Sequence, residues 1–246
     1  MLKLIALVSL VATHVAAHGY VQELTLGSEK YTGYLPYSDN LQDPPPARII
    51  RKIPDFMPIT DLTRIDLQCG GSPTFETAPA PLVGKIAAGE TVHLNWTAWP
   101  DNHKGPVLTY LARPPAGVDI TEWVPGTDAV WFKIDQFGKE DGKWAAADKL
   151  TADSGVWSVK IPENLLPGQY ILRNEIIDLH SAAQYPGIQF FPSCAQIEVT
   201  GSGTAFPTEF VSIPGVYEPD TPGIVWDIGV EGDYTSPGPA VWTGVA

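Results

Sequence analysis

Apolar and polar side chains alternate most clearly between Thr91 and Trp99. A period of two predicts a β-strand that buries one of its faces. Residues 157–161 alternate in the same way, and residues 170–177 and 196–200 are rich in apolar and β-branched side chains. Several short strands separated by turn-forming residues favour an all-β fold, an antiparallel β-sandwich.

Proline and glycine are spread along the chain, with 24 and 23 residues respectively. This distribution disfavours long helices and favours turns between strands. Residues 27–66 are rich in turn formers and weakly periodic, so we expect a long surface loop region there, with a short helical turn near residues 61–64. The segment from Gly201 onward is also predicted to be loop, and its aromatic residues indicate that it packs on the domain.

Residues 1–17 have the features of a secretory signal peptide. Lys3 provides a positive charge, residues 4–12 are apolar, and residues 15–17 form a small-residue cleavage site. The apolar run is too short to be a membrane span. We therefore expect a secreted, extracellular protein in which residues 18–246 form a single domain with His18 at its N-terminus, and with no carbohydrate-binding module after it.

Charge and cysteine content narrow the partners and the compartment. The formal net charge is −13, and loss of Lys3 with the leader makes it −14. Such an acidic chain argues against nucleic acid and anionic polymers as partners and is compatible with a neutral substrate. Cys69 and Cys194 form an even pair that usually closes a disulfide in an oxidising compartment, with two free buried thiols as the alternative. A loop of this length would add roughly 4–5 kcal/mol of stability.

The histidines carry the candidate chemistry. His93 lies on the polar face of the predicted strand 91–99, where a solvated or hydrogen-bonded surface role is expected. His103 follows that strand in a turn, and alone it would more often be a solvated loop residue. An N-terminal His18 changes this reading, because its α-amino and ring nitrogens can chelate one metal ion together. A third nitrogen from His103 completes a set that suits copper(II).

Four segments, taken in order, resemble one family. They are "HGYVQ" after the leader, "WTAWPDNHKGPVLTYLA", "LRNEIIDLHSAAQYPGIQFFPSCAQIEVTG" and "PGPAVWTG". Together they resemble the fungal copper-dependent lytic polysaccharide monooxygenases of auxiliary activity family nine, formerly glycoside hydrolase family 61. The resemblance implies an immunoglobulin-like antiparallel β-sandwich with long loops and few short helices. It also implies one copper ion held by His18 and His103, and a disulfide between Cys69 and Cys194.

The third segment implies the residues next to the metal. His180 and Gln189 match a histidine and a glutamine that hydrogen-bond oxygen species beside the copper in this family; a buried polar pair that serves packing only is the alternative. Phe191 stands where the family usually has a tyrosine whose oxygen lies axial to copper, so this chain cannot supply that oxygen. Asn174 is a second departure, at a position that is commonly histidine.

Substrate contacts are implied by tyrosines. Tyr20 and Tyr234 match positions at which the family stacks aromatic rings on sugar faces, and Tyr37 is a weaker candidate. A core role for Tyr20 is equally compatible with the sequence. Asn95 begins a formal N-glycosylation sequon in the middle of the predicted strand.

The resemblance implies a secreted monooxygenase that cleaves cellulose or a related β-1,4-glucan at C1 and/or C4. The implied cofactor is one copper ion per chain, with oxygen or hydrogen peroxide as co-substrate. An external reductant or electron-donor enzyme would supply electrons, and we expect a monomer without membrane or nucleic-acid partners. Two alternatives stay open: a non-catalytic copper-binding or glucan-binding protein of the same fold, and a glycoside hydrolase, which would need two carboxylates across a cleft.

Overall fold

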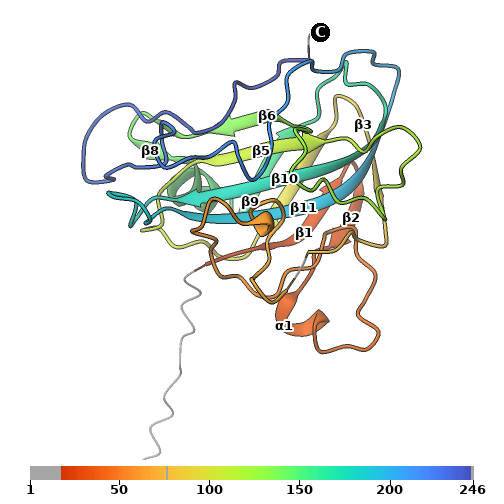
Figure 1. Ribbon diagram of the computed structural model, residues 1–246, viewed down its shortest axis with the longest axis horizontal. Coiled ribbons are helices and arrows are strands. Elements are labelled where there is room, and N and C mark those ends of the chain that lie inside the picture. Colours follow the sequence, from red (N-terminus) through yellow and green to blue (C-terminus); the bar gives the residue numbers. More distant parts are fainter. Residues whose placement is uncertain (1–17, 76, 245–246) are drawn as a thin grey trace, which may run out of the picture.

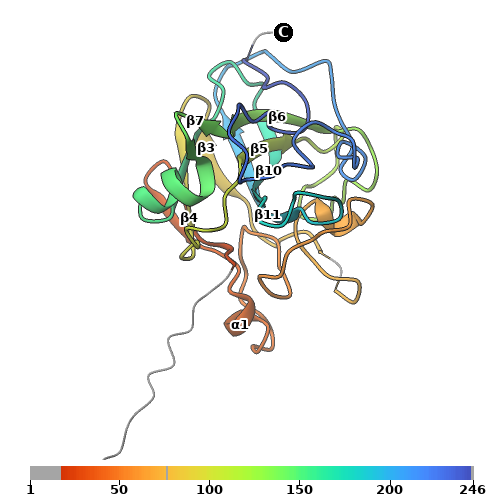
Figure 2. The ribbon, with the colours of Figure 1, turned by 90° about the vertical axis from the view of Figure 1, so that its left-hand side faces the viewer.

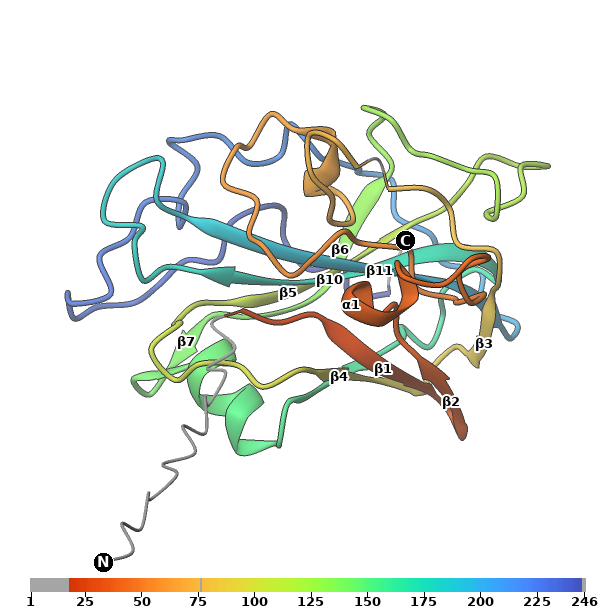
Figure 3. The same cartoon turned by 90° about the horizontal axis from the view of Figure 1, so that it is seen from below.

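The structure is a computed structural model that describes residues 18–75 and 77–244, so the expected signal peptide lies outside the described residues. Two β-sheets face each other as the layers of a sandwich (Figure 1, Figure 3). The strands of the first sheet, in the order β2-β1-β4-β9, are β1 (Val21–Leu26), β2 (Glu29–Thr32), β4 (Thr91–Trp96) and β9 (Val156–Lys160). Those of the second sheet, in the order β3-β11-β10-β5-β6, are β3 (Gly84–Ala87), β5 (Val107–Ala112), β6 (Trp131–Phe137), β10 (Gly168–Asp178) and β11 (Gln189–Thr200).

The remaining elements are short. They are the pair β7 (Lys139–Glu140) and β8 (Lys143–Trp144), helix α1 (Pro36–Asp39), the 3-10 turn η1 (Ile65–Leu67) and the π-helical turn η2 (Ala145–Leu150). This confirms the predicted all-β sandwich with few short helices. One edge pair departs from the antiparallel expectation, because β3 runs parallel to β11. No helix among the described residues is both long and apolar enough to cross a membrane.

Strand β4 shows why the alternating pattern was informative. Its burial alternates along Thr91–Trp96, so that Val92, Leu94 and Trp96 face the core. The strand ends earlier than predicted, and Ala98, expected on the apolar face, is exposed. His93 is exposed as predicted, and its Nδ1 lies 2.8 Å from the Ser158 hydroxyl on β9.

Two hydrophobic cores explain why the other predicted strands lack alternation. The first core lies between the two sheets. The second lies on the outer face of the five-stranded sheet, which long loops cover (Figure 2). Strands β5, β10 and β11 contribute to both cores and are buried on both faces along most of their length. A strand buried on both faces has a nearly continuous apolar pattern.

The loop prediction for residues 27–66 was only partly correct. The region contains β2 and α1, which its weak periodicity did not indicate. The helical turn expected at residues 61–64 lies directly after that range, in η1. The C-terminal segment packs on the domain as predicted, since the Trp242 backbone N–H donates to the Lys133 carbonyl of β6 at 2.8 Å.

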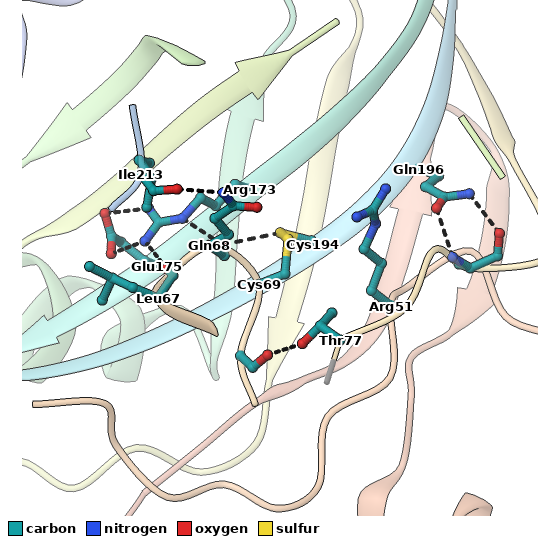
Figure 4. The surroundings of a disulfide bond; sticks show 12 residues. Arg51, Leu67, Gln68, Cys69, Thr77, Arg173, Glu175, Cys194, Gln196 and Ile213 are labelled. Atoms are coloured by element: carbon teal, nitrogen blue, oxygen red, sulfur yellow. Dashed lines mark hydrogen bonds and ion pairs between the residues drawn. A yellow bond between two sulfur atoms is a disulfide. The ribbon is translucent and has the colours of Figure 1, made fainter. Parts of the chain in front are cut away.

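The expected disulfide between Cys69 and Cys194 is formed (Figure 4). It ties the loop that follows η1 to β11 across 125 positions of sequence. Beside it, the Arg173 side chain donates hydrogen bonds to the backbone carbonyls of Leu67 and Gln68 and forms an ion pair with Glu175. The disulfide and the Arg173 hydrogen bonds therefore anchor the same loop to the sheet.

Candidate metal centre

Four of the predicted site residues lie at one end of the sandwich. His18 precedes β1, His103 lies in the turn after β4, His180 follows β10, and Gln189 begins β11. The first described residues, in red, run past the end of the five-stranded sheet at which β10 and β11 are connected (Figure 3). Segments far apart in the sequence therefore bring these side chains together.

A glycine allows the His103 turn to reach β10. A Cβ atom on Gly105 would lie 1.8 Å from the Ile177 carbonyl oxygen, so no other residue fits this close backbone approach. Two backbone hydrogen bonds fix the contact, from Ile177 N–H to the Pro106 carbonyl and from Leu179 N–H to the Lys104 carbonyl. The turn is thereby held against the last residues of β10.

The imidazole rings lie close enough to share one ion. The ring centroids of His18 and His103 are 5.5 Å apart, with an interplanar angle of 70°. Two imidazoles on opposite sides of one ion, with metal–nitrogen bonds of about 2 Å, would have centroids about 6 Å apart. His103 Nδ1–H donates to the Asn102 side-chain oxygen at 2.9 Å, which leaves Nε2 as the nitrogen with a free lone pair. This donor set fits a copper ion.

Asp178 is a site residue that the sequence analysis missed. Its carboxylate is fully buried, and Oδ2 lies 3.7 Å from His103 Nε2. The same oxygen accepts a short hydrogen bond from His180 Nδ1, and Oδ1 accepts the His180 backbone N–H at 3.0 Å. Donor atoms of His103, Asp178 and His180 all lie within 4.8 Å of one another. The only signal in the sequence was the spacing of an aspartate two residues before a histidine at a strand end.

Gln189 lies opposite Asp178, because these two residues pair across β10 and β11. Its side-chain oxygen Oε1 is buried and makes no hydrogen bond of normal geometry within residues 18–75 and 77–244. A buried side-chain oxygen without a hydrogen bond is rare and costs free energy unless a ligand or water satisfies it. The amide is close enough to the His18 ring to raise the pKa of that imidazole.

Burial keeps the two candidate ligand imidazoles neutral. It is the largest influence on His18 and lowers its pKa, and the neighbouring His103 lowers it further, while Asp178 and Gln189 raise it. Burial also lowers the pKa of His103, against the opposing effect of Asp178. A metal binds the neutral imidazole, so both shifts favour metal binding near neutral pH.

Comparison with known proteins supports the same reading. The sequence profile of Auxiliary Activity family 9 (formerly GH61) matches residues 18–236. The chain belongs to this family. It is 52% identical over 237 residues to AA9 family lytic polysaccharide monooxygenase B of Gloeophyllum trabeum, which covers 95% of this chain and 94% of that relative. It is 53% identical over 235 residues to the corresponding enzyme B of Malbranchea cinnamomea, covering 94% of each.

Solved structures of family 9 share the fold. The extended catalytic domain of LPMO9A from H. jecorina superposes with a TM-score of 0.85 at 32% identity and covers 93% of this chain and 92% of that one. A cellulose-active polysaccharide monooxygenase from M. thermophila superposes with a TM-score of 0.76 at 31% identity, over 92% of this chain and 99% of that one. The β-sandwich of this chain is therefore the family 9 sandwich.

Phe191 occupies the position at which the resemblance implies an axial tyrosine in family 9. Its ring is buried and stacks on the His18 ring, with centroids 5.1 Å apart and planes 28° from parallel. It also meets Trp99 edge-on at 5.1 Å. The ring therefore shields one side of His18 and supports it by packing, without offering an oxygen atom.

Aromatic side chains continue from His18 toward the surface. Phe56, which the sequence analysis did not single out, lies 6.0 Å from the His18 ring. Tyr37 on α1 meets Phe56 edge-on at 5.3 Å and is 54% exposed. Tyr20 is half-buried, packs partly against the core and donates its backbone N–H to Thr97 Oγ1. An aromatic row of the half-buried Phe56 and the exposed Tyr37 thus begins next to the histidines.

The expectation that Tyr234 contacts substrate is corrected. Its ring is only 9% exposed and packs between Trp144 and Trp226. Its hydroxyl donates to the Gly223 carbonyl at 2.9 Å, so its polar end is satisfied inside the protein. Tyr234 is a core residue that holds the C-terminal segment, and it has no ring face to offer to a sugar.

Asn174, the second departure from the family pattern, is also a core residue. Its Oδ1 accepts the Trp96 indole N–H at 3.0 Å, and its amide nitrogen donates to Thr109 Oγ1 at 2.9 Å. It therefore links the two sheets through hydrogen bonds. Asn95 is half-buried on β4, and its glycosylation stays a prediction.

Proposed function

We propose that this protein is a secreted, copper-dependent monooxygenase that oxidatively cleaves β-1,4-glucan chains, in cellulose or a related glucan, at C1 and/or C4. Membership of family 9, with relatives named lytic polysaccharide monooxygenases, supports oxidative cleavage of a polysaccharide. The observation that carries the proposal for this chain is the approach of the His18 and His103 rings at one end of the sandwich, beside His180 and the buried Oε1 of Gln189.

His18 and His103 would hold the copper ion. Removal of residues 1–17 as a signal peptide would free the His18 α-amino group, so that the amine and the ring act together with His103 Nε2. Copper, when bound, supplies one-electron chemistry toward oxygen or hydrogen peroxide, with electrons from an external donor. The protein contributes a fixed geometry, because the His103 turn is locked against β10 and Phe191 packs on the His18 ring.

His180 and Gln189 would hold and move protons beside the ion. Asp178 accepts from His180 Nδ1, so Nε2 is the nitrogen left to give or take a proton. The His180 side chain is 31% exposed, which lets it exchange protons with solvent. The Gln189 amide nitrogen can donate to an oxygen species, and its buried Oε1, which makes no hydrogen bond of normal geometry among the described residues, can accept from a protonated one.

The substrate would dock on the aromatic row beside the histidines. Phe56 and the exposed Tyr37 form this row, and the half-buried Tyr20 follows His18 by two positions. Accessible aromatic rings can stack on the apolar faces of sugars at small entropic cost. A net charge of −13 favours a neutral glucan over an anionic one. We propose that residues 18–246 act as a single domain and as a monomer.

The two alternatives are less well supported. Among the described residues, the carboxylate nearest to the histidines is Asp178, which is buried and already bonded to His180. That arrangement does not resemble two carboxylates facing each other across a cleft, as a glycoside hydrolase needs. A copper carrier would have no use for His180 and for the buried Oε1 of Gln189 beside the metal.

Product analysis on amorphous cellulose tests the proposal. The mature protein, loaded with copper and supplied with ascorbate and oxygen, should release oligosaccharides oxidised at C1 or C4. Release should stop with a chelator, without reductant, or in His103→Ala, whereas His93→Ala should match the wild type because His93 lies on the exposed face of β4. Unoxidised products that persist with chelator would establish a hydrolase, and copper binding without any product would establish a carrier.

A further inference from the structure

The position of Asp178 is not explained by its hydrogen bonds to His180 alone. It is the last residue of β10, and its carboxylate lies between two imidazoles. One contact is with His180, because the Asp178 carboxylate accepts hydrogen bonds from the ring and backbone N–H groups of that residue. The other is the 3.7 Å approach of Oδ2 to His103 Nε2. Since His103 Nδ1 is engaged by Asn102, the nitrogen that faces Asp178 is the one available to a metal ion.

The distance between Asp178 Oδ2 and His103 Nε2 suits two ligands of one metal ion. Donor atoms bound to the same metal, with bonds of about 2.0–2.5 Å, lie about 3–4 Å apart. Oδ2 of Asp178 and Nε2 of His103 fall inside that range. A carboxylate oxygen has two lone-pair positions, so Oδ2 can accept from His180 and still coordinate an ion. Because the side chain is fully buried, bulk water does not screen its charge from the site.

The chain also lacks the oxygen that an axial tyrosine would provide, because Phe191 offers only a ring. We propose that the Asp178 carboxylate takes part in the copper site as an oxygen donor, beside the nitrogens of His18 and His103. This inference rests on the proposed function, since it assumes that copper occupies the site. An anionic oxygen favours copper(II) over copper(I), so Asp178 would lower the reduction potential of the site.

Electron paramagnetic resonance of the copper(II) protein tests the inference with a readout independent of activity. Asp178→Ala should change the copper hyperfine splitting and lower copper(II) affinity by about 10- to 100-fold, with a smaller loss for copper(I). Asp178→Asn keeps the size and an acceptor for the His180 N–H, so it should fold normally and shift the spectrum in the same direction. Asp101→Asn removes the same charge from an exposed position in the His103 turn and should leave the spectrum unchanged.

His180→Ala separates coordination from positioning. If Asp178 coordinates the ion, His180→Ala should leave most of the hyperfine splitting intact, because the carboxylate stays in place. If His180→Ala reproduces the Asp178→Ala spectrum, Asp178 acts only through His180 and the inference is overturned. Spectra and affinities of both Asp178 variants that equal the wild type would overturn it as well. A wild-type chain that binds no copper would instead refute the proposed function.

Discussion

Strand β10 carries two polar clusters that differ in how their members are partnered. Near its middle, Arg173 and Glu175 are both fully buried and form an ion pair. Tyr217 donates its hydroxyl to Glu175 at 2.5 Å and lies 2.8 Å from the Tyr110 hydroxyl. Arg173 Nη2 also donates to Glu175, whereas Arg173 Nη1 is held by the ion pair and makes no hydrogen bond of normal geometry among the described residues. Through Arg173 the cluster connects the sheet to the loop that carries Leu67 and Gln68.

At the end of the same strand, not every polar side-chain atom has a hydrogen-bond partner among the described residues. Asp178 engages His180 and approaches His103, but Gln189 Oε1 has no hydrogen bond of normal geometry among the described side chains and backbone. The His103 ring contacts the rings of both His18 and His180 here. In the first cluster both oxygens of Glu175 are engaged by protein groups, and the cluster anchors the fold. The second cluster keeps a carboxamide oxygen and an imidazole nitrogen that a ligand can engage.

The largest effect should come from breaking the first cluster. Glu175→Ala leaves the Arg173 guanidinium buried without its carboxylate, and we expect a loss of about 3–5 kcal/mol in the free energy of unfolding. Denaturant unfolding measures it. Glu175→Gln, which keeps a hydrogen-bond acceptor, should lose less. A loss below about 1 kcal/mol for the alanine variant would show that the pair is not a structural anchor.

Gln189→Ala should have little effect on stability and a large effect on activity. Removing a half-buried side chain whose Oε1 makes no hydrogen bond of normal geometry among the described residues should leave the free energy of unfolding nearly unchanged. Product yield per bound copper should fall by about 10- to 100-fold, with copper affinity little altered. Parallel calorimetry and product analysis provide the check. A stability loss like that of Glu175→Ala would place Gln189 among the structural groups.

The smallest effect concerns pH. Because burial lowers the pKa of His18 and His103 below 6.5, the unfolded chain binds more protons than the metal-free folded protein just below that pH. The stability of the metal-free protein should therefore rise as the pH increases toward 6.5 and level off above it. Denaturant midpoints measured across this range should show the rise, and His103→Asn should make it shallower. An unchanged dependence of stability on pH in His103→Asn would show that the lowered pKa of His103 does not contribute to the rise.

The sequence pattern predicted a strand clearly only where one face of that strand is exposed to water. Alternation predicted β4, because one face of that strand is exposed. Alternation did not show which residues of β10 and β11 face which side of the sheet, because the two hydrophobic cores bury both faces of these strands. The short elements β2 and α1 were missed, since their few residues carry no periodic signal.

The site was predictable only where a motif marked it. His18, His103, His180 and Gln189 were found by resemblance, and the structure brings them to one end of the sandwich. Asp178 was missed because its role depends on the turn that Gly105 brings against β10, which no local pattern reveals. Tyr234 was misassigned for the same reason, since its burial depends on the folding of the C-terminal segment over it.

In the proposed site a free His18 amine and two imidazoles hold one copper ion. Calorimetric titration with copper(II) tests it most directly, comparing a chain that begins at His18 with one that keeps Ala17 in front of it. We expect one tightly bound ion in the first chain and an affinity at least about 100-fold weaker in the second, where the amine has become an amide. Equal affinities in the two chains would show that the His18 amine does not bind the ion.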